Sequence, residues 1–170
     1  MAGYGLPKEQ HLSVVLQNSL EVEGHKIKII NGSVSGSTSA GGLNIAEWTL
    51  SQSNIDLMIL CLGANDMLRG INPKETKNNL EEIIQIAKNK KIKIIITGMI
   101  APTSYGSEYK ESFDKIFFNL SKEYNLQLIP FLLEGVAQKP EFNLSDGMHP
   151  NDQGTIIIGN TLKKAILENL

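Results

Sequence analysis

The sequence predicts an α/β fold in which a parallel sheet is covered by helices on both faces, a three-layer α/β/α sandwich. Two observations support this prediction: apolar runs alternate with amphipathic segments, and each apolar run is continuous. A continuous apolar run is typical of a strand that is covered on both faces, as in parallel sheets. With 170 residues and 41% hydrophobic content, residues 1–170 are expected to form a single domain.

The first predicted element is a helix, because apolar residues recur at helical spacing and Gly24 ends the segment. These apolar residues are Leu12, Val15, Leu16 and Leu20. Residues 26–31 (KIKIIN) then predict a buried strand. A turn rich in glycine and serine, GSVSGSTSAGG, leads from this strand into a helix that contains Leu43, Ala46 and Leu50.

The rest of the chain continues the alternation of strand and helix. Further strands are predicted at the apolar runs of residues 55–62, 92–98 and 126–131. Amphipathic helices are predicted at residues 75–90, 109–124 and 152–170. Ligands of such sheets bind beyond the carboxyl ends of the strands, where this chain carries GSVSGS, GAND and GMIAPTS. Because the first element is a helix, one strand–helix unit is half complete.

Charge and composition exclude several classes of partner. The formal net charge is −2, so no overall cationic field attracts nucleic acid. The one basic cluster, residues 88–93 (KNKKIK), lies where a helix should end and suits the helix dipole. No stretch approaches the ~20 apolar residues that span a bilayer, so no transmembrane segment is expected. The single cysteine, Cys61, is predicted to be a buried strand residue rather than a nucleophile.

Asp146 and His149, in DGMHPN, are candidate catalytic residues. A carboxylate three residues before a histidine can turn back to the imidazole and fix its tautomer, which leaves the other ring nitrogen to act as a general base. An isolated pair with this spacing also fits an aspartate that caps the final helix beside a solvated histidine. The motif alone leaves both interpretations open.

Two further candidates follow strands and could stabilise negative charge on an oxygen. Asn65, in LGAND, carries a side-chain amide that can donate to a developing oxyanion. Gly36, in SVSGSTS, can turn a backbone N–H into the site. The alternative for Asn65 and Asp66 is a turn or a helix cap. The serine-rich turn fits neither GxxxxGK[ST] nor GxGxxG, so phosphate binding is not expected.

Taken together, NGSVSGSTSAGGL, LGANDMLRGINP and DGMHPN resemble, in order and spacing, the later sequence blocks of the SGNH (GDSL-type) hydrolases. The similarity is strongest to the bacterial arylesterase and thioesterase I branch, and it continues through MIAPTSYGSEY and LIPFLLEGVA. The resemblance implies a flavodoxin-like sheet and hydrolysis of a small acyl ester or thioester of the arylesterase, acyl-CoA thioesterase or lysophospholipase type. It implies no metal and no organic cofactor.

The resemblance also implies a role for each candidate residue. Gly36 corresponds to the backbone oxyanion donor and Asn65 to the side-chain donor. His149 corresponds to the general base, and Asp146 to the residue that orients it. Ser37 departs from the family pattern, in which close relatives carry aspartate, and this puts in doubt how firmly the turn presents Gly36.

In that family a first strand ending in GDSL, which carries the nucleophilic serine, precedes AGYGLP. Here AGYGLP occupies residues 2–7, so we expect the domain to be N-terminally incomplete, without that strand and serine. The strand would lie centrally, between residues 26–31 and 55–62, and its loss should cost as much as the ~5–15 kcal/mol stability of a domain. Other serines lie in or near the predicted turns and loops, but none is expected to replace the nucleophile. These are Ser33, Ser35, Ser37, Ser39 and Ser104.

Two functions of different classes follow. One is an esterase or thioesterase, inactive as the chain stands if the serine is absent. The other is a catalytically dead α/β domain that binds a ligand or a partner. For the esterase, the loop at residues 99–109 is expected to border the acyl pocket, with Ile100, Pro102 and Tyr105 as an apolar wall. A preceding signal peptide would make the protein periplasmic, and otherwise it would be cytoplasmic.

Overall fold

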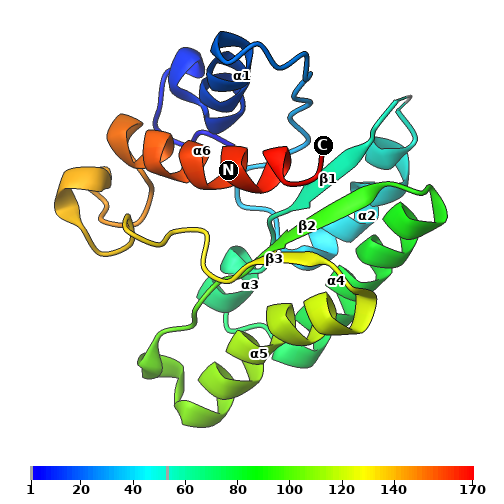
Figure 1. Ribbon diagram of the computed structural model, residues 1–170. Helices are drawn as coiled ribbons and strands as arrows, with labels where there is room; N and C mark the ends of the chain where they lie inside the picture. The colour runs from blue at the N-terminus through cyan, green and yellow to red at the C-terminus, as the bar shows by residue number, and fades with distance from the viewer. Residues whose placement is uncertain (1, 53) are drawn as a thin grey trace. The chain divides into compact units, whose positions relative to one another are not determined.

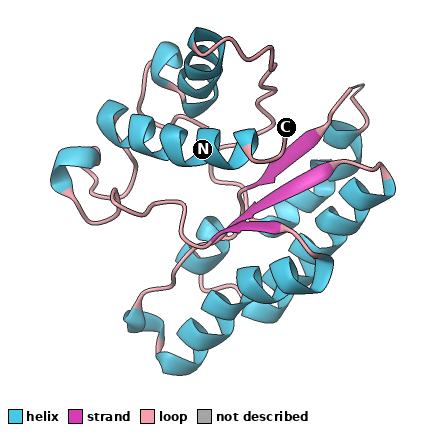
Figure 2. Cartoon of the chain, in the orientation of Figure 1, coloured by secondary structure: helices cyan, strands magenta, loops and turns pink. Residues whose placement is uncertain are grey.

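The computed structural model describes residues 2–52 and 54–170 and has an α/β fold with one parallel sheet, as predicted (Figures 1 and 2). The α-helices are α1 (Leu12–Val22), α2 (Ser39–Leu50), α3 (Ala64–Leu68), α4 (Pro73–Asn89), α5 (Ser107–Tyr124) and α6 (Asp152–Leu167). The strands are β1 (Leu57–Leu60), β2 (Lys93–Thr97) and β3 (Gln127–Ile129). Short 3₁₀ helices occur at Lys8–Gln10, Thr103–Tyr105 and Pro140–Phe142.

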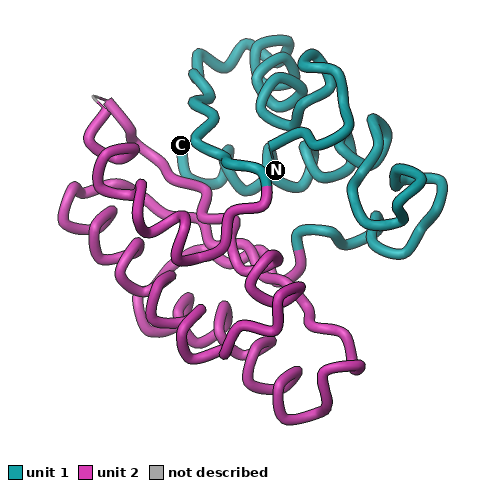
Figure 3. The backbone as a smooth tube through the Cα atoms, turned by 180° about the vertical axis from the view of Figure 1, so that it is seen from behind, with its two compact units in different colours: residues 1–35, 132–170 teal, residues 36–131 magenta. Residues whose placement is uncertain are grey.

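The chain divides into two compact units, which Figure 3 shows in different colours. Unit 1 comprises residues 1–35 and 132–170, and it contains α1 and α6. Unit 2 comprises residues 36–131, and it contains the three strands with α2, α3, α4 and α5.

Unit 2 is built on a three-stranded sheet in the order β1–β2–β3, with both pairs parallel. Leu57 is paired with Lys93 and Ile95 with Gln127, which fixes the register. Helix α4 packs against both α2 and α5, and α4 and α5 also pack against the strands (Figure 2). Their buried side chains form one apolar cluster with the strands.

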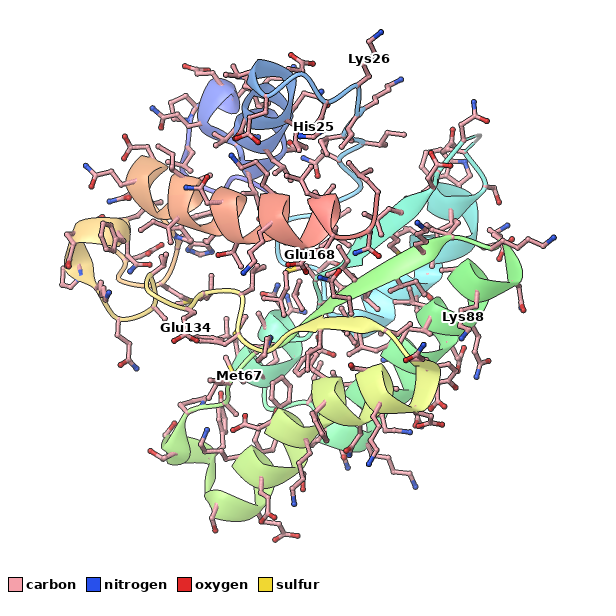
Figure 4. The ribbon with its side chains drawn as sticks, viewed as in Figure 1. His25, Lys26, Met67, Lys88, Glu134 and Glu168 are labelled. Atoms are coloured by element: carbon pink, nitrogen blue, oxygen red, sulfur yellow. The ribbon has the colours of Figure 1, made fainter. Side chains whose placement is uncertain are left out.

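Helix α4 shows how local sequence signals set the bounds of an element. Asn72 caps its amino terminus by accepting a hydrogen bond from Lys74 N, and Pro73 occupies the first turn, where its missing N–H costs nothing. The predicted apolar positions Leu80, Ile83, Ile84 and Ala87 are all buried. At the other end, Lys88, which is labelled in Figure 4, lies on the last turn. Its ammonium group donates to the Tyr124 carbonyl oxygen at 3.2 Å. Part of the basic cluster therefore ties α4 to α5.

In unit 1, α1 packs along α6. Leu12, Leu16 and Leu20 are buried on α1, as the helical spacing predicts. The ammonium group of Lys163 on α6 bonds Ser19 at 2.9 Å and pairs with Glu23. These contacts fix one helix against the other within the unit.

The predicted strand at residues 26–31 is not a strand in the structure. Its side chains alternate between half-buried and exposed, so the prediction of a buried strand was wrong. The Gln17 side chain on α1 donates to Ile27 O and accepts from Ile29 N, each at 2.6 Å. A strand forms its hydrogen bonds with the backbone of a neighbouring strand. Here the Gln17 side-chain amide supplies two of those hydrogen bonds instead.

Other elements differ from prediction in their bounds. Strand β1 is four residues long, shorter than the predicted run of residues 55–62, and Cys61 follows it as a half-buried residue rather than a buried strand residue. Helix α2 begins at Ser39, inside the predicted turn, because Thr38 caps it by accepting from Gly41 N. Helix α3 was not predicted. Within the described part of the chain, no helix has the length and apolarity required to cross a membrane.

Candidate active site

Asp146 and His149 form a hydrogen-bonded pair in unit 1. The Asp146 Oδ2 atom lies 2.7 Å from His149 Nδ1. Asp146 Oδ1 accepts from the backbone N–H groups of Met148 and His149, each at 2.9 Å. Gly147 permits this tight turn because its φ of 67° lies in the left-handed region. The spacing of DGMH thus brings the carboxylate back onto the ring, as the sequence predicts.

The electrostatics of this pair define which ring nitrogen is available. The backbone N–H of His149, the backbone N–H of Met148 and the imidazole, in that order, lower the pKa of Asp146 from 3.8 to about 2. An ionised carboxylate only accepts hydrogen bonds, so the proton of the shared bond lies on His149 Nδ1. The Nε2 atom of a neutral ring then carries a lone pair and can accept a proton.

The capping interpretation of Asp146 is wrong. Asn151 is the N-cap of α6, and its side chain accepts a hydrogen bond from Gly154 N at 3.0 Å. Asn151 also donates to Glu141 O at 2.9 Å, which anchors the start of the helix to the preceding loop. The cap of the final helix is therefore provided without Asp146.

Asn65 lies in the first turn of α3 in unit 2, directly after β1. Gly63, with a φ of 109°, makes the sharp turn from the strand into this helix. The Asn65 side-chain amide is half-buried and donates to Ser37 O at 3.0 Å. An amide has two N–H donors, so this bond fixes its orientation while the second donor stays available to a ligand.

Gly36 lies in the turn that approaches α3. Its φ is 73°, a conformation that glycine adopts without strain. The Gly36 carbonyl oxygen accepts a hydrogen bond from Arg69 Nη2 at 2.8 Å. Arg69 and Asn65 therefore hold adjacent residues, Gly36 and Ser37, of the same turn. The structure thus brings the two predicted oxyanion donors onto neighbouring, connected segments of unit 2.

Asp66, the residue after Asn65, was predicted from the sequence only as part of a turn or a helix cap, and it has a larger structural role. It is fully buried, and it accepts from Ser39 N at 2.8 Å, from Ser39 Oγ and from Thr76 Oγ1 at 3.2 Å. Ser39 begins α2 and Thr76 lies on α4, so one carboxylate joins three helices around Asn65. A buried carboxylate that accepts several hydrogen bonds is held in one position, and it fixes the segments that donate to it. Its position beside Asn65 was the signal available in the sequence.

The loop after β2 lies next to α3 within unit 2. Tyr105 Oη donates to Leu68 O at 3.1 Å, and Asp114 on α5 accepts from Ala101 N at 2.8 Å. Ile100, Tyr105 and Leu68 nevertheless remain 46%, 40% and 47% exposed. The hydrogen bonds thus anchor the loop to α3 and α5 while these apolar side chains stay exposed.

The predicted site residues thus fall into two connected pairs, one in each unit. Unit 1 brings together Asp146 and His149, and unit 2 brings together Gly36 and Asn65. Within residues 2–52 and 54–170, no group of three or more His, Cys, Asp or Glu side chains is placed to hold a metal ion.

An α/β fold with polar side chains after its strands is typical of an α/β enzyme. Comparison with known proteins shows the family to which the chain belongs. The model of the GDSL-like lipase/acylhydrolase family matches residues 1–155. An arylesterase of Vibrio mimicus is 34% identical over 169 residues, which is 99% of this chain and 84% of that protein. Thioesterase 1/protease 1/lysophospholipase L1 of Escherichia coli K12 is 34% identical over 141 residues, 83% of this chain and 68% of the relative.

Among solved structures, a crystal structure of TesA matches with a TM-score of 0.93 and 31% sequence identity. The match covers 99% of this chain and 94% of that chain. The chain therefore belongs to the GDSL-like lipase/acylhydrolase family, the SGNH hydrolases, as the sequence motifs indicated. Its relatives in this family are named as esterases and thioesterases.

Proposed function

We propose that this chain carries the proton-transfer pair and two oxyanion donors of an enzyme that hydrolyses small carboxylic esters or thioesters. The observation that carries the proposal is the 2.7 Å contact between Asp146 Oδ2 and His149 Nδ1, in which an ionised carboxylate orients the ring. The names of the relatives, an arylesterase and a thioesterase, support the same substrate class.

In the proposed reaction a serine Oγ attacks the acyl carbon, and His149 Nε2 takes the hydroxyl proton. The carbonyl oxygen becomes negative, and the Asn65 amide and the Gly36 N–H donate to it. The C–O or C–S bond then breaks, and the histidine returns the proton to the leaving alcohol or thiol. Water, deprotonated by the same ring, releases the acid from the acyl-enzyme.

We further propose that residues 1–170 belong to one hydrolase domain and that the serine of the reaction lies on a strand that pairs with β1. Two observations support this. Strand β1 is paired only with β2 among the described residues, and residues 26–31 use the Gln17 side chain where a strand would use a neighbour. An apolar strand edge without a partner leaves backbone groups to be satisfied by another segment.

The substrate class is also supported by the loop after β2. Ile100 and Tyr105 are exposed apolar residues on a loop that is bonded to α3, the helix that carries Asn65. We propose that Ile100, Pro102 and Tyr105 contact the acyl chain.

The test is hydrolysis of p-nitrophenyl acetate and of a longer p-nitrophenyl ester by two proteins. One is the chain of 170 residues, and the other is the same chain preceded by an apolar strand that ends in Gly-Asp-Ser-Leu. We expect the extended protein to be active, and its activity to disappear both in His149→Ala and when the added serine is replaced by alanine.

Two results would contradict the proposal. If the extended protein folds and yet hydrolyses neither ester, the chain is better described as an inactive ligand-binding or partner-binding domain. If His149→Ala keeps full activity in the extended protein, a different base is used and the assigned site is wrong.

A further inference from the structure

We propose that Tyr4 is a positioning residue for His149: its ring packs on one face of the imidazole and holds it in the orientation that Asp146 sets. This inference rests on the proposed function for its catalytic meaning, but its geometry lies entirely within unit 1. The sequence analysis assigned no role to Tyr4.

The contact itself is direct. The ring centroids of Tyr4 and His149 are 4.4 Å apart, and the ring planes are inclined by 32°. Aromatic rings with centroids this close are in van der Waals contact, and the inclination brings one part of the Tyr4 ring nearest to the imidazole. The side chain of His149 is 42% exposed, so no deep pocket restricts it. One hydrogen bond at Nδ1 still permits the ring to tilt about that bond, and a second ring against its face restricts the tilt.

Tyr4 is delivered to this place by a rigid turn. Leu6 N donates to Gly3 O at 3.1 Å, and His11 Nε2 donates to Leu6 O at the same distance. The φ of Gly3 is 78°, and a Cβ there would lie 2.2 Å from the His11 ring. The backbone of the turn therefore lies flat against His11, which explains the glycine before Tyr4.

The same turn also abuts the loop that carries the histidine. A Cβ on Gly5 would lie 2.7 Å from Leu144 Cδ1. Leu144 N in turn donates to His149 O at 2.7 Å. The turn therefore packs against the Leu144 side chain of the His149 loop, in addition to the contact between the two rings.

This arrangement has a consequence for reactivity. With Asp146 at Nδ1 and Tyr4 on one face, reagents approach His149 through its Nε2 edge and the remaining face. Removing the Tyr4 ring opens the covered face and frees the tilt of the imidazole. Tyr4 itself is 58% exposed, so its substitution removes little buried surface.

The experiment uses the chain of 170 residues and requires no ester hydrolysis. Diethyl pyrocarbonate acylates neutral histidine nitrogens, and peptide mass mapping separates His149 from His11 and His25. We expect Tyr4→Leu to raise the modification rate of His149 several-fold, and Tyr4→Phe to keep the original rate. Trp48→Leu, which removes another exposed aromatic ring, is the matched control and should leave the rate unchanged.

A second measurement does not depend on any variant folding. In the unmodified protein, nuclear Overhauser effects should connect the Tyr4 ring protons with the carbon-bound ring protons of His149. In the same unmodified protein, the ring current of Tyr4 should displace the chemical shifts of those His149 protons from their random-coil values.

Absence of the Overhauser effects, or an unchanged His149 rate in a folded Tyr4→Leu protein, would overturn the proposal. So would a Tyr4→Phe protein that behaves like Tyr4→Leu, because the hydroxyl rather than the ring would then be responsible. Since neither readout involves ester cleavage, failure of the proposed hydrolase activity would be recognised separately.

Discussion

The carboxylate of Asp146 holds His149 at two points, through Oδ1 to its backbone N–H at 2.9 Å and through Oδ2 to Nδ1 at 2.7 Å. The ring and the backbone that carries it are therefore fixed by the same side chain. Two hydrogen bonds from one carboxylate to the same residue require the short spacing of the DGMH segment, with a glycine in the left-handed conformation between Asp146 and His149.

The first prediction concerns the titration of Asp146. Its carboxyl pKa is lowered from 3.8 to about 2, chiefly by the backbone N–H groups of His149 and Met148. The folded state therefore binds fewer protons than the unfolded state, and the contribution of this group to stability is complete above pH ~4 and is lost as the pH falls through ~2. Carboxyl-carbon NMR shifts should show a midpoint near 2.

His149→Ala provides the control for that titration. The variant removes the imidazole bond but keeps both backbone donors, so the pKa of Asp146 should rise only part of the way towards 3.8. A complete return to 3.8 would mean that the ring, and not the backbone, is the main cause of the shift.

If Asn65 is the proposed oxyanion donor, Asn65→Ala should reduce kcat of the protein extended by the Gly-Asp-Ser-Leu strand about 10²–10³-fold. Asn78→Ala, a matched change at an exposed position on α4, should leave kcat unchanged. The Ser37 bond is lost as well, so a decrease of about 1 kcal/mol in the free energy of unfolding is expected. Full activity of Asn65→Ala would remove this residue from the site.

Asp66→Ala should lower the free energy of unfolding by about 2–3 kcal/mol, because Ser39 N, Ser39 Oγ and Thr76 Oγ1 lose a buried hydrogen-bond acceptor. Urea unfolding followed by circular dichroism measures this change. Asp56→Ala removes an exposed carboxylate from the same unit and should change the value by less than about 0.5 kcal/mol. Equal effects of the two substitutions would show that the buried network contributes nothing.

One substitution, glycine to alanine, should have opposite effects at two positions. At Gly98 a Cβ would lie 2.0 Å from Pro130 O, a backbone atom. The free energy of unfolding of Gly98→Ala should therefore decrease by about 1–3 kcal/mol. At Gly159, inside α6, the nearest neighbours of a Cβ are Val15 Cγ1 at 3.6 Å and Leu12 Cδ1 at 3.7 Å. The free energy of unfolding of Gly159→Ala should therefore increase by about 0.5–1 kcal/mol, because alanine has the higher helix propensity. Thermal unfolding of both variants tests the pair, and a change of the same sign would contradict it.

The helices and the parallel strands could be predicted because their signals are local. The spacing of Leu80, Ile83, Ile84 and Ala87 describes a buried helix face by itself, and Asn72 with Pro73 marks its start. The pairing of Asp146 with His149 was predictable for a similar reason, since three residues and one glycine suffice to close that turn.

Residues 26–31 show where local signals are insufficient. Their apolar content is that of a strand, but a strand exists only through its partner, and here Gln17 supplies hydrogen bonds from a helix. The Tyr4 contact with His149 and the Asp66 contacts with Ser39 and Thr76 likewise join residues that are far apart in the sequence.

The sequence by itself determined the order of strands β1 to β3 and of the longer helices, the family, and the identity of the Asp146–His149 pair, because periodicity, caps and short-range turns depend on neighbouring residues. Only the tertiary structure decided which strand predictions became strands, what fixes the Asn65 amide and which ring covers the histidine. Those features depend on hydrogen bonds and contacts across long stretches of chain, and they exist only when the partner segment is folded beside them.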